Sequence, residues 1–81
     1  MARHAKSKLL ADPAAFRKAK GQNQKDFWGQ FGVTQSGGSR YESDRTIPQP
    51  LRMLLWLYES GRIGDADLQA AMKITGNPNE Q

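Results

Sequence analysis

The stretch NQKDFWGQFGVTQSGGSRYES, residues 23–43, decides the fold of this chain because it holds two helix starts and one very short turn. Asn23 is a good N-cap, and Gly32 is suited to close the segment that follows it. The next start signal, Thr34, comes only two residues after Gly32. The spacing therefore predicts two helices joined by a tight turn, which is the geometry of a helix-turn-helix.

Toward the N-terminus, the segment DPAAFRKAKG, residues 12–21, carries the signals of a further helix. Asp12 is a favourable N-cap, Pro13 suits the first helical position, and the closing glycine can take the left-handed conformation that ends a helix. The pattern predicts a helix over residues 13–20. Two of its side chains are expected to face inward, those of Phe16 and Ala19.

Toward the C-terminus, the loop SDRTIPQP, residues 43–50, precedes a strongly apolar segment. Pro50 is expected at the first helical position of that segment, and Gly61 is expected to end it. The helix has two apolar stripes, formed by Leu51, Leu54, Leu55 and Tyr58 and by Met53, Trp56 and Leu57. A helix that is apolar on two sides must be covered twice, and a helix over residues 65–74 is expected to supply part of the second cover.

The chain shows no strand-like alternation and no internal repeat, so we predict an all-α fold, a compact bundle of about five short helices that contains the helix-turn-helix. Residues 1–11 are predicted to be a basic, flexible arm, although Leu9 and Leu10 could pack or extend the first helix backward. Residues 12–76 form the predicted domain, and residues 77–81 are predicted to be a mobile tail.

The composition excludes several classes of protein. A length of 81 residues allows one small domain and no catalytic domain beside it. The chain has no cysteine, and its single histidine, His4, has no second ligand nearby, so we expect no disulfide, metal or cofactor. No apolar run reaches membrane-spanning length, and the N-terminus lacks the apolar region of a secretory signal. We therefore expect a cytoplasmic protein with no membrane partner.

Positive charge is concentrated near the N-terminus. The first 25 residues hold seven basic residues and one acidic residue, a net charge of +6, whereas the whole chain has a net charge of +4. Such asymmetry indicates a surface that binds an anion, either nucleic acid or an acidic membrane, or else a basic face that is merely solvated.

The helix-turn-helix and its flanks resemble the Cro/C1-type family of phage repressors and XRE-like bacterial regulators over about residues 13–60. The shared features are a basic helix that ends in glycine, the pair NQ opening the next helix, a glycine turn, VTQS, and SRYES before a loop with proline. The spacing of Gln24, Gly32 and Tyr41 also matches that family. The resemblance implies a lambda-repressor-like fold and a nucleoid-associated regulator that binds DNA.

At two positions the side-chain size departs from the family, with a larger residue at one position and a smaller residue at the other. The family commonly has a small residue where this chain has Trp28, and a branched aliphatic residue where it has Gly38. We predict that Gly38, helped by Gly37, makes room for the indole where the two helices cross, with Tyr41 also turned inward. The two glycines cost roughly 2 kcal/mol, whereas a buried Trp removes about 200 Å² from water, worth about 5 kcal/mol. The alternative is a partly exposed Trp28 beside a flexible joint.

The second helix of a helix-turn-helix enters the major groove of DNA. With Thr34 as its N-cap, the predicted helix turns Gly38 and Tyr41 inward and its polar side chains outward. The candidates for base contacts are Gln35, Ser36, Ser39 and Arg40. Arg40 is the strongest because Arg pairs with guanine, and a plain phosphate contact is its alternative. The candidates for phosphate contacts are Gln24, Ser43, Arg45, the Leu51 amide, Lys6 and Lys8.

The resemblance also implies an ion pair between Arg17 and Glu42 that holds the reading helix against the first helix of the domain. Removing one partner of such a pair is costly. A further departure from the family is Gln22, at a position that is often Leu. A core contact is lost there, and Leu9 or Leu10 could replace it.

The resulting functional prediction is a sequence-specific regulator of transcription, not an enzyme, that binds double-stranded DNA as a homodimeric repressor on a palindromic operator. The candidates for the dimer contact are Met53, Trp56, Leu57 and Met72. The alternative for this apolar set is an internal core. The alternative function is an antitoxin-type interaction module that binds a second protein and regulates its own gene.

Three other classes lack essential features. A phosphate-binding glycine loop would need a preceding strand and a lysine before Ser39, where this chain has Gly38. No catalytic constellation of serine, histidine and acid is recognisable. Binding to RNA or to an anionic membrane would call for an aromatic stacking surface or a long amphipathic helix.

Overall fold

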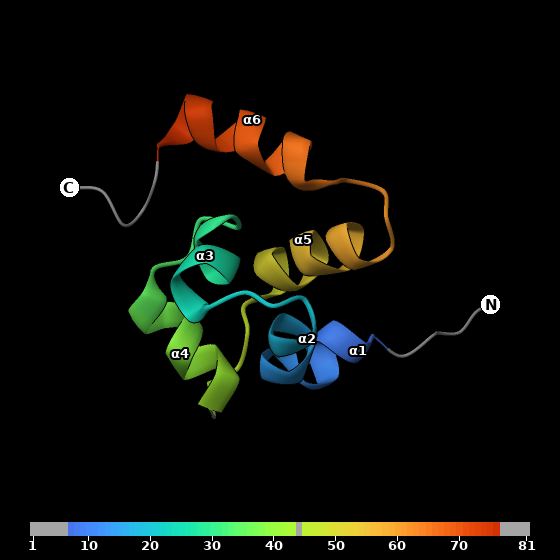
Figure 1. Ribbon diagram of the computed structural model, residues 1–81, viewed down its shortest axis with the longest axis vertical. Helices are drawn as coiled ribbons and strands as arrows, with labels where there is room; N and C mark the ends of the chain where they lie inside the picture. Colours follow the sequence, from blue (N-terminus) through green and yellow to red (C-terminus); the bar gives the residue numbers. More distant parts are fainter. Residues whose placement is uncertain (1–6, 44, 77–81) are drawn as a thin grey trace.

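The computed structural model describes residues 7–43 and 45–76, and within these ranges it contains six helices and no strand (Figure 1). The helices are α1 (Lys8–Ala11), α2 (Pro13–Ala19), α3 (Gln24–Gly29), α4 (Gln35–Ser43), α5 (Gln49–Glu59) and α6 (Asp65–Thr75). The predicted all-α class is confirmed, with one helix more than expected. None of the helices described has the length and apolar character needed to cross a membrane.

The prediction of a flexible arm over residues 1–11 is wrong for its last part, where Leu9 and Leu10 pack on the core as the alternative allowed. Lys8–Ala11 form the additional helix α1, and the side chain of Leu9 is fully buried. Ser7 caps this helix by accepting a hydrogen bond from the amide of Leu10 at 3.0 Å. The folded domain therefore extends to Ser7. The rest of the predicted arm, with the candidate Lys6, and the predicted tail over residues 77–81 lie outside the described residues.

The carboxylate of Glu59, at the end of α5, binds the start of α1. It accepts hydrogen bonds from the hydroxyl of Ser7 and from the amides of Lys8 at 3.1 Å and Leu9 at 3.3 Å. A carboxylate at a helix N-terminus satisfies amides that have no partner inside the helix. These contacts join residues about 50 positions apart in the sequence, so no local pattern reveals them.

The helices α2, α3 and α4 begin at the predicted caps. Asp12 and Asn23 each accept a hydrogen bond from the amide three residues later, at 3.1 and 2.7 Å, and Thr34 does the same at 3.1 Å. Gly32, with a φ of 79°, reverses the chain between α3 and α4 in a conformation that favours glycine. Because α3 already ends at Gly29, the turn is longer than the sequence predicts.

Aromatic side chains fill the centre of the domain. The rings of Phe27, Trp28 and Phe31 are buried. Their centroids lie 5.4 Å apart for Phe27 and Trp28 and 5.3 Å apart for Phe27 and Phe31, in the edge-to-face arrangement that aromatic pairs prefer. Phe16 packs against this cluster as predicted. Ala19 does not, because it is the last residue of α2, one turn past the Phe16 contact, and it is exposed.

The helix α5 has only one of its two apolar stripes covered. It begins at Gln49, one residue before Pro50, and buries Leu55 completely. On the second stripe Met53 is 58% exposed and Trp56 is 43% exposed. The described chain therefore leaves large apolar side chains of α5 in water.

The helix α6 lies above α3 and α5 in Figure 1 and buries Leu68. It forms a shallow groove with Phe31 and Leu54, and Met72 lines the same groove. The hydroxyl of Tyr58 donates a hydrogen bond to the first residue of α6 at 3.0 Å. The prediction that this helix covers the second stripe of α5 is therefore wrong, because α6 lies against the side that carries Leu54.

Candidate nucleic-acid interface

The crossing of α3 and α4 depends on Trp28 and Gly38. Trp28 is fully buried, and a Cβ added at Gly38 would overlap Cγ and Cδ1 of the indole and lie 2.8 Å from its Cβ. The predicted exchange of sizes is therefore confirmed for Gly38. It is wrong for Gly37, because a Cβ there would meet the side chains of Val33 and Thr34 instead of the indole.

The helix α4 presents polar side chains on its outer face. Three of the four candidates for base contacts are exposed: Gln35, Ser36 and Arg40. The fourth, Ser39, is half-buried at the edge of this face. Facing the opposite way are Gly38, which is buried, and Tyr41, whose ring centroid lies 5.7 Å from that of Trp28. The predicted division of α4 into an inner and an outer face is confirmed.

A buried carboxylate near the end of α4, that of Glu42, joins three helices. Arg17 of α2 donates from Nε to Oε2 at 2.7 Å and from Nη2 to Oε1 at 3.1 Å. Two residues of α3 also donate to it, Trp28 from Nε1 to Oε2 at 2.7 Å and Gln24 from Nε2 to Oε1 at 3.1 Å. The expected ion pair is present, with side chains only 11% and 6% exposed for Arg17 and Glu42. We call these four residues the Glu42 network.

The network keeps Glu42 ionised. Burial by itself would raise the pKa of Glu42, but hydrogen bonds from Arg17, Trp28 and Gln24 outweigh burial, and the pKa is lowered. The hydrogen bond to Glu42 raises the pKa of Arg17. Four donated hydrogen bonds also occupy the roughly four acceptor sites of a carboxylate. The Glu42 network therefore holds α4 in place, and the carboxylate of Glu42 has no acceptor site left for a ligand.

Two bonds of this network are absent from the sequence prediction, those from Trp28 and Gln24. A buried indole N–H needs an acceptor, but that requirement does not say which residue supplies it. No sequence signal connects Gln24 with Glu42. The side chain of Gln24, predicted to contact phosphate, is half-buried and uses one of its two Nε2 hydrogens inside the protein.

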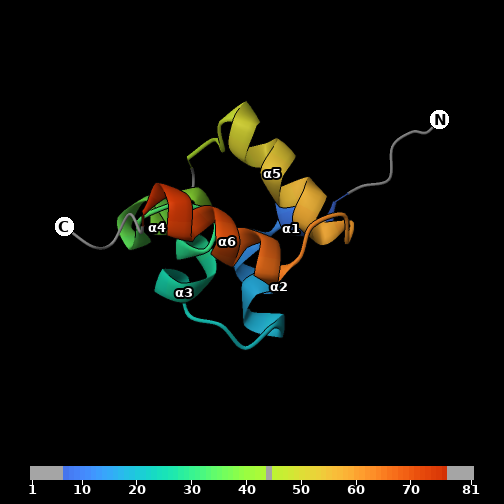
Figure 2. The same ribbon diagram turned by 90° about the horizontal axis from the view of Figure 1, so that it is seen from above.

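The other phosphate candidates differ in their surroundings. Ser43 donates its only hydroxyl hydrogen to the carbonyl of Ser39 at 2.9 Å, so it is not arranged to donate to a phosphate. Lys8 lies on α1, which packs on α2 and α5 and lies apart from α4 in Figures 1 and 2. Leu51 lies in the first turn of α5, where no side chain caps the helix, so its amide remains a candidate.

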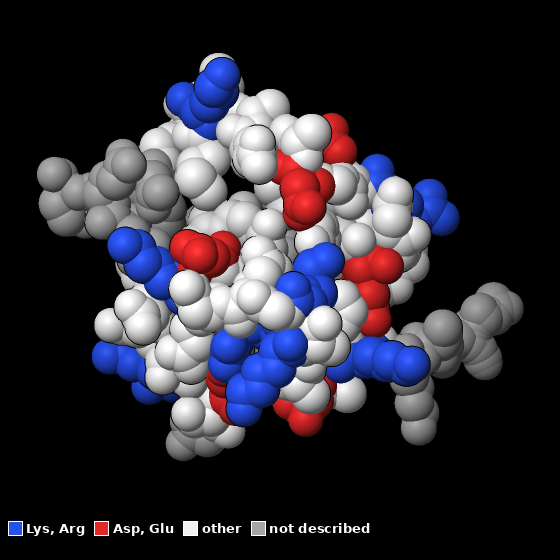
Figure 3. Space-filling model, in the orientation of Figure 1, with Lys and Arg blue, Asp and Glu red and all other residues white. Residues whose placement is uncertain are grey.

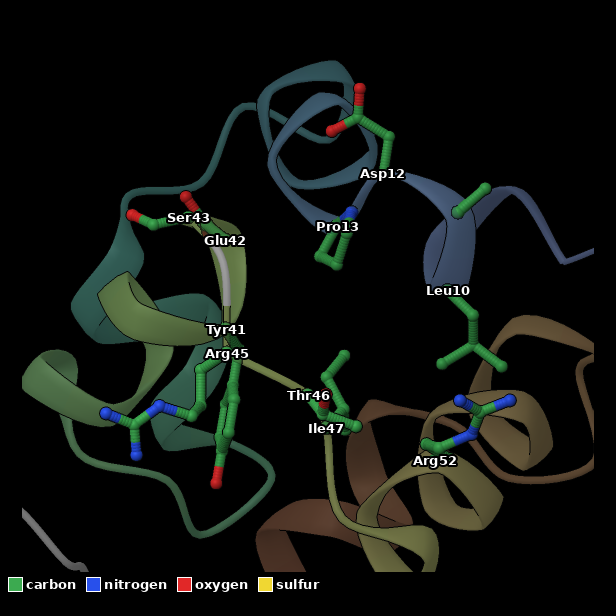
Figure 4. Close-up of a pocket in the computed structure, with 11 residues that line it drawn as sticks. Leu10, Asp12, Pro13, Tyr41, Glu42, Ser43, Arg45, Thr46, Ile47 and Arg52 are labelled. Carbon is green, nitrogen blue, oxygen red and sulfur yellow. The ribbon is translucent and has the colours of Figure 1, made fainter.

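A polar groove separates α1 and α2 from the loop that follows α4 (Figure 4). Arg52 lies beside Leu10 at one side of this groove, whereas the guanidinium of Arg45 points away from it. The amide of Arg45 donates to the carbonyl of Arg40 at 3.0 Å, so the chain continues directly from the end of α4. Arg45 is exposed and remains a candidate for a phosphate contact next to the outer face of α4.

Positive charge is distributed over the domain. In Figure 3 many Lys and Arg side chains lie on the lower half of the face shown, where α2 and α4 lie in Figure 1, with acidic side chains among them. The exposed cations early in the described chain include Lys18, Lys20 and Lys25. The ammonium group of Lys20 lies 5.2 Å from the ring centroid of Tyr58, so this cation also helps to pack α2 against α5.

A second groove, which we call the α5 groove, is lined by Leu10, Gln49, Arg52, Met53, Trp56 and Leu57. It contains three of the four candidates for the dimer contact. The fourth, Met72, lies in the separate groove beside α6, so the structure does not bring it together with the others. Because Met53 and Trp56 are exposed, the alternative of an internal core is wrong for these two side chains.

Comparisons with known proteins agree with this geometry. The family model of the RsaL-like HTH domain matches residues 14–58, which include the whole helix-turn-helix. A solved structure of the quorum-sensing repressor RsaL from Pseudomonas aeruginosa is 38% identical, with a TM-score of 0.72, and the match covers 80% of this chain and 97% of that chain. No curated protein sequence matches significantly. The chain therefore belongs to the RsaL-like helix-turn-helix family of DNA-binding domains.

Proposed function

We propose that this chain is a sequence-specific repressor of transcription that reads the major groove of double-stranded DNA with α4. The observation that carries the proposal is the seating of α4, whose inner face is wedged against Trp28 and whose outer face exposes Gln35, Ser36 and Arg40. The membership of the chain in this family and its similarity to the repressor RsaL support the same role. The role is one of binding and occlusion, not catalysis.

The side chains of the outer face have distinct proposed tasks. Arg40 donates two hydrogen bonds to the N7 and O6 atoms of guanine, and Gln35 pairs with adenine. Arg45, the amide of Leu51 and the side chain of Gln24 contact phosphates and fix the register of α4 on the duplex. Each base contact of this kind contributes about 1 to 3 kcal/mol of discrimination against the wrong base.

We also propose that a second copy of the chain docks on the α5 groove. Met53 and Trp56 are 58% and 43% exposed there, and large apolar side chains gathered in one exposed groove are typical of a protein contact. A two-fold symmetric dimer would present two α4 helices about 34 Å apart, which matches a palindromic operator. We expect sedimentation to show a dimer that Met53→Asp dissociates. A chain that stayed monomeric at high concentration would contradict this part of the proposal.

Selection of bound duplexes from a random pool, at a stated salt concentration, tests DNA reading. We expect the wild-type chain to select one consensus and Arg40→Ala to lose the preference for one base in each half-site. The matched control is Lys73→Ala, which also removes an exposed positive charge but lies on α6, outside the helix-turn-helix. We expect the control to keep the wild-type consensus.

Two outcomes would contradict direct reading by Arg40. If Arg40→Ala weakened all sequences equally, Arg40 would contact only phosphate. If the wild-type chain selected no consensus at all, sequence-specific regulation would be rejected.

The exposed α5 groove also favours a second candidate, an antitoxin-type module that binds another protein there. A monomeric chain that still selects a DNA consensus would favour this candidate over the homodimer. For either function we place the family near the Cro/C1-type regulators, on the strength of the shared turn and ion pair, and we expect the protein to act in the cytoplasm on the nucleoid.

A further inference from the structure

The Glu42 network connects a residue proposed to contact phosphate with the helix proposed to read bases. Glu42 lies near the end of α4, and Gln24 is the first residue of α3. The two side chains meet through the hydrogen bond from Gln24 Nε2 to Glu42 Oε1, at 3.1 Å. The proposed phosphate contact and the proposed reading helix are thus joined by one direct bond.

Glu42 is a rigid acceptor because its own position is determined on several sides. Arg17 holds both carboxylate oxygens, and the indole of Trp28 holds Oε2 at 2.7 Å. The side chain of Glu42 is 6% exposed, so little of it is accessible to water. Its negative charge is paired with the guanidinium of Arg17, which lessens the repulsion that a bare carboxylate would exert on a nearby phosphate.

The carboxamide of Gln24 keeps capacity for an outside ligand. Its nitrogen carries two hydrogens, and Glu42 accepts one of them. The structure shows no other hydrogen bond of this side-chain nitrogen within residues 7–43 and 45–76. The side chain is half-buried, and its neighbour Lys25 is an exposed cation on the same turn of α3. The second hydrogen of Nε2 therefore remains available for donation to a phosphate oxygen.

We propose that Glu42 is a positioning residue for DNA binding, which holds the Gln24 carboxamide so that its second Nε2 hydrogen is directed at a backbone phosphate. This inference rests on the function proposed above. A glutamine side chain has several rotatable bonds, and ordering it at the moment of binding weakens the complex. Glu42 orders Gln24 before DNA arrives. Glu42 therefore affects affinity through Gln24, in addition to holding α4 in place.

A double-mutant cycle on DNA affinity separates these two effects of Glu42. The variants are Gln24→Ala, Glu42→Gln and the double variant, measured on the duplex selected by the wild-type chain. We expect Glu42→Gln to weaken binding about tenfold in the wild-type background and only about threefold in the Gln24→Ala background, where its role in holding α4 remains. The matched control pairs Glu42→Gln with Arg45→Ala, a phosphate candidate with no bond to Glu42, and there the two losses should multiply.

A second measurement does not depend on the folding of any variant. In the free wild-type protein, nuclear magnetic resonance order parameters of the side-chain amides should show Gln24 as ordered and Gln69, an exposed residue in the middle of α6, as mobile. A Gln24 amide as mobile as that of Gln69 would overturn the inference.

The outcomes distinguish this inference from the proposed function. If the wild-type chain binds its duplex and the losses from Gln24→Ala and Glu42→Gln simply multiply, Glu42 is only structural and the inference is wrong, while the proposed function stands. If the chain binds no duplex specifically, the proposed function and the inference both fail. If the cycle shows the expected coupling and the Gln24 amide is ordered, the inference is supported.

Discussion

Replacing Gly38 with alanine tests the contact that seats α4. In an unobstructed helix, Gly→Ala raises the free energy of unfolding by about 1 kcal/mol. Here the new methyl group would overlap Cγ and Cδ1 of Trp28 and lie 2.8 Å from its Cβ. The indole is fully buried, and moving it would also disturb its N–H bond to Glu42 at 2.7 Å.

The expected size of the effect follows from these opposing contributions. Overpacking a core costs typically about 1 to 3 kcal/mol, and disturbing a buried hydrogen bond to a charged group costs roughly 1.5 to 3 kcal/mol. With the low end of both costs, and after subtraction of the gain in helix propensity, the net loss for Gly38→Ala is about 2 kcal/mol. In a domain of this size such a loss lowers Tm by roughly 8 to 16 °C. The total stability of about 4 to 12 kcal/mol leaves the variant folded.

The assay is urea and thermal unfolding followed by circular dichroism, with Gly37→Ala as the matched control. A Cβ at Gly37 would lie 3.1 Å from Val33 Cγ1 and 3.3 Å from Thr34 Oγ1, which are the ends of side chains that are not fully buried. We therefore expect Gly37→Ala to stay within about 1 kcal/mol of the wild type. An unchanged urea m-value would show that the comparison concerns stability alone. A Gly38→Ala variant as stable as the wild type, or no less stable than Gly37→Ala, would refute the reasoning.

Three further predictions concern stability. The side-chain oxygen of Gln22 is buried without a hydrogen-bond partner among the described residues. Gln22→Leu should therefore raise the free energy of unfolding by about 1 kcal/mol and raise Tm. A lower Tm would contradict this prediction. The pKa of Glu42 is lowered in the folded state, so its contribution to stability is complete above the unfolded pKa near 4.5 and is lost as the pH falls through the folded pKa. Urea unfolding between pH 7 and 3 should therefore show a drop in the free energy of unfolding that Glu42→Gln lacks. Equal pH profiles of the two proteins would exclude this role. Leu9→Ala should lower the free energy of chemical unfolding by roughly 2 to 5 kcal/mol because the side chain of Leu9 is fully buried. The control is Leu10→Ala, which should cost less because Leu10 is half-buried. Equal small losses for both variants would restore the prediction of a flexible arm.

The cap residues of α2, α3 and α4 are predictable because they act locally. Asp12, Asn23 and Thr34 each accept a hydrogen bond from an amide only three residues later. A chain segment of that length contains all the atoms involved, so residue type and spacing suffice. The pairing of Trp28 with Gly38 is also predictable, since a large and a small residue stand at the two positions where the predicted helices cross.

The contacts of α1 are not predictable in this way. The positive charge of residues 1–11 favours a solvated arm, yet Leu9 is buried and Glu59 binds the first amides of α1. The partner of these amides is supplied by the far end of α5. No periodicity within the segment contains that information, because it depends on where α5 ends in space.

The sequence by itself determined the helices α2 to α6, the caps of α2, α3 and α4, the turn at Gly32 and the outward face of α4, because each depends on residues within a few positions of one another or on the helical repeat. Only the tertiary structure decided which stripe of α5 remains in water and which donors converge on Glu42. Those features depend on the angles at which helices distant in sequence pack, and many arrangements of the same helices would bury similar apolar area. The side chains that meet in the folded domain, Gln24, Trp28 and Arg17 around Glu42, select the arrangement observed.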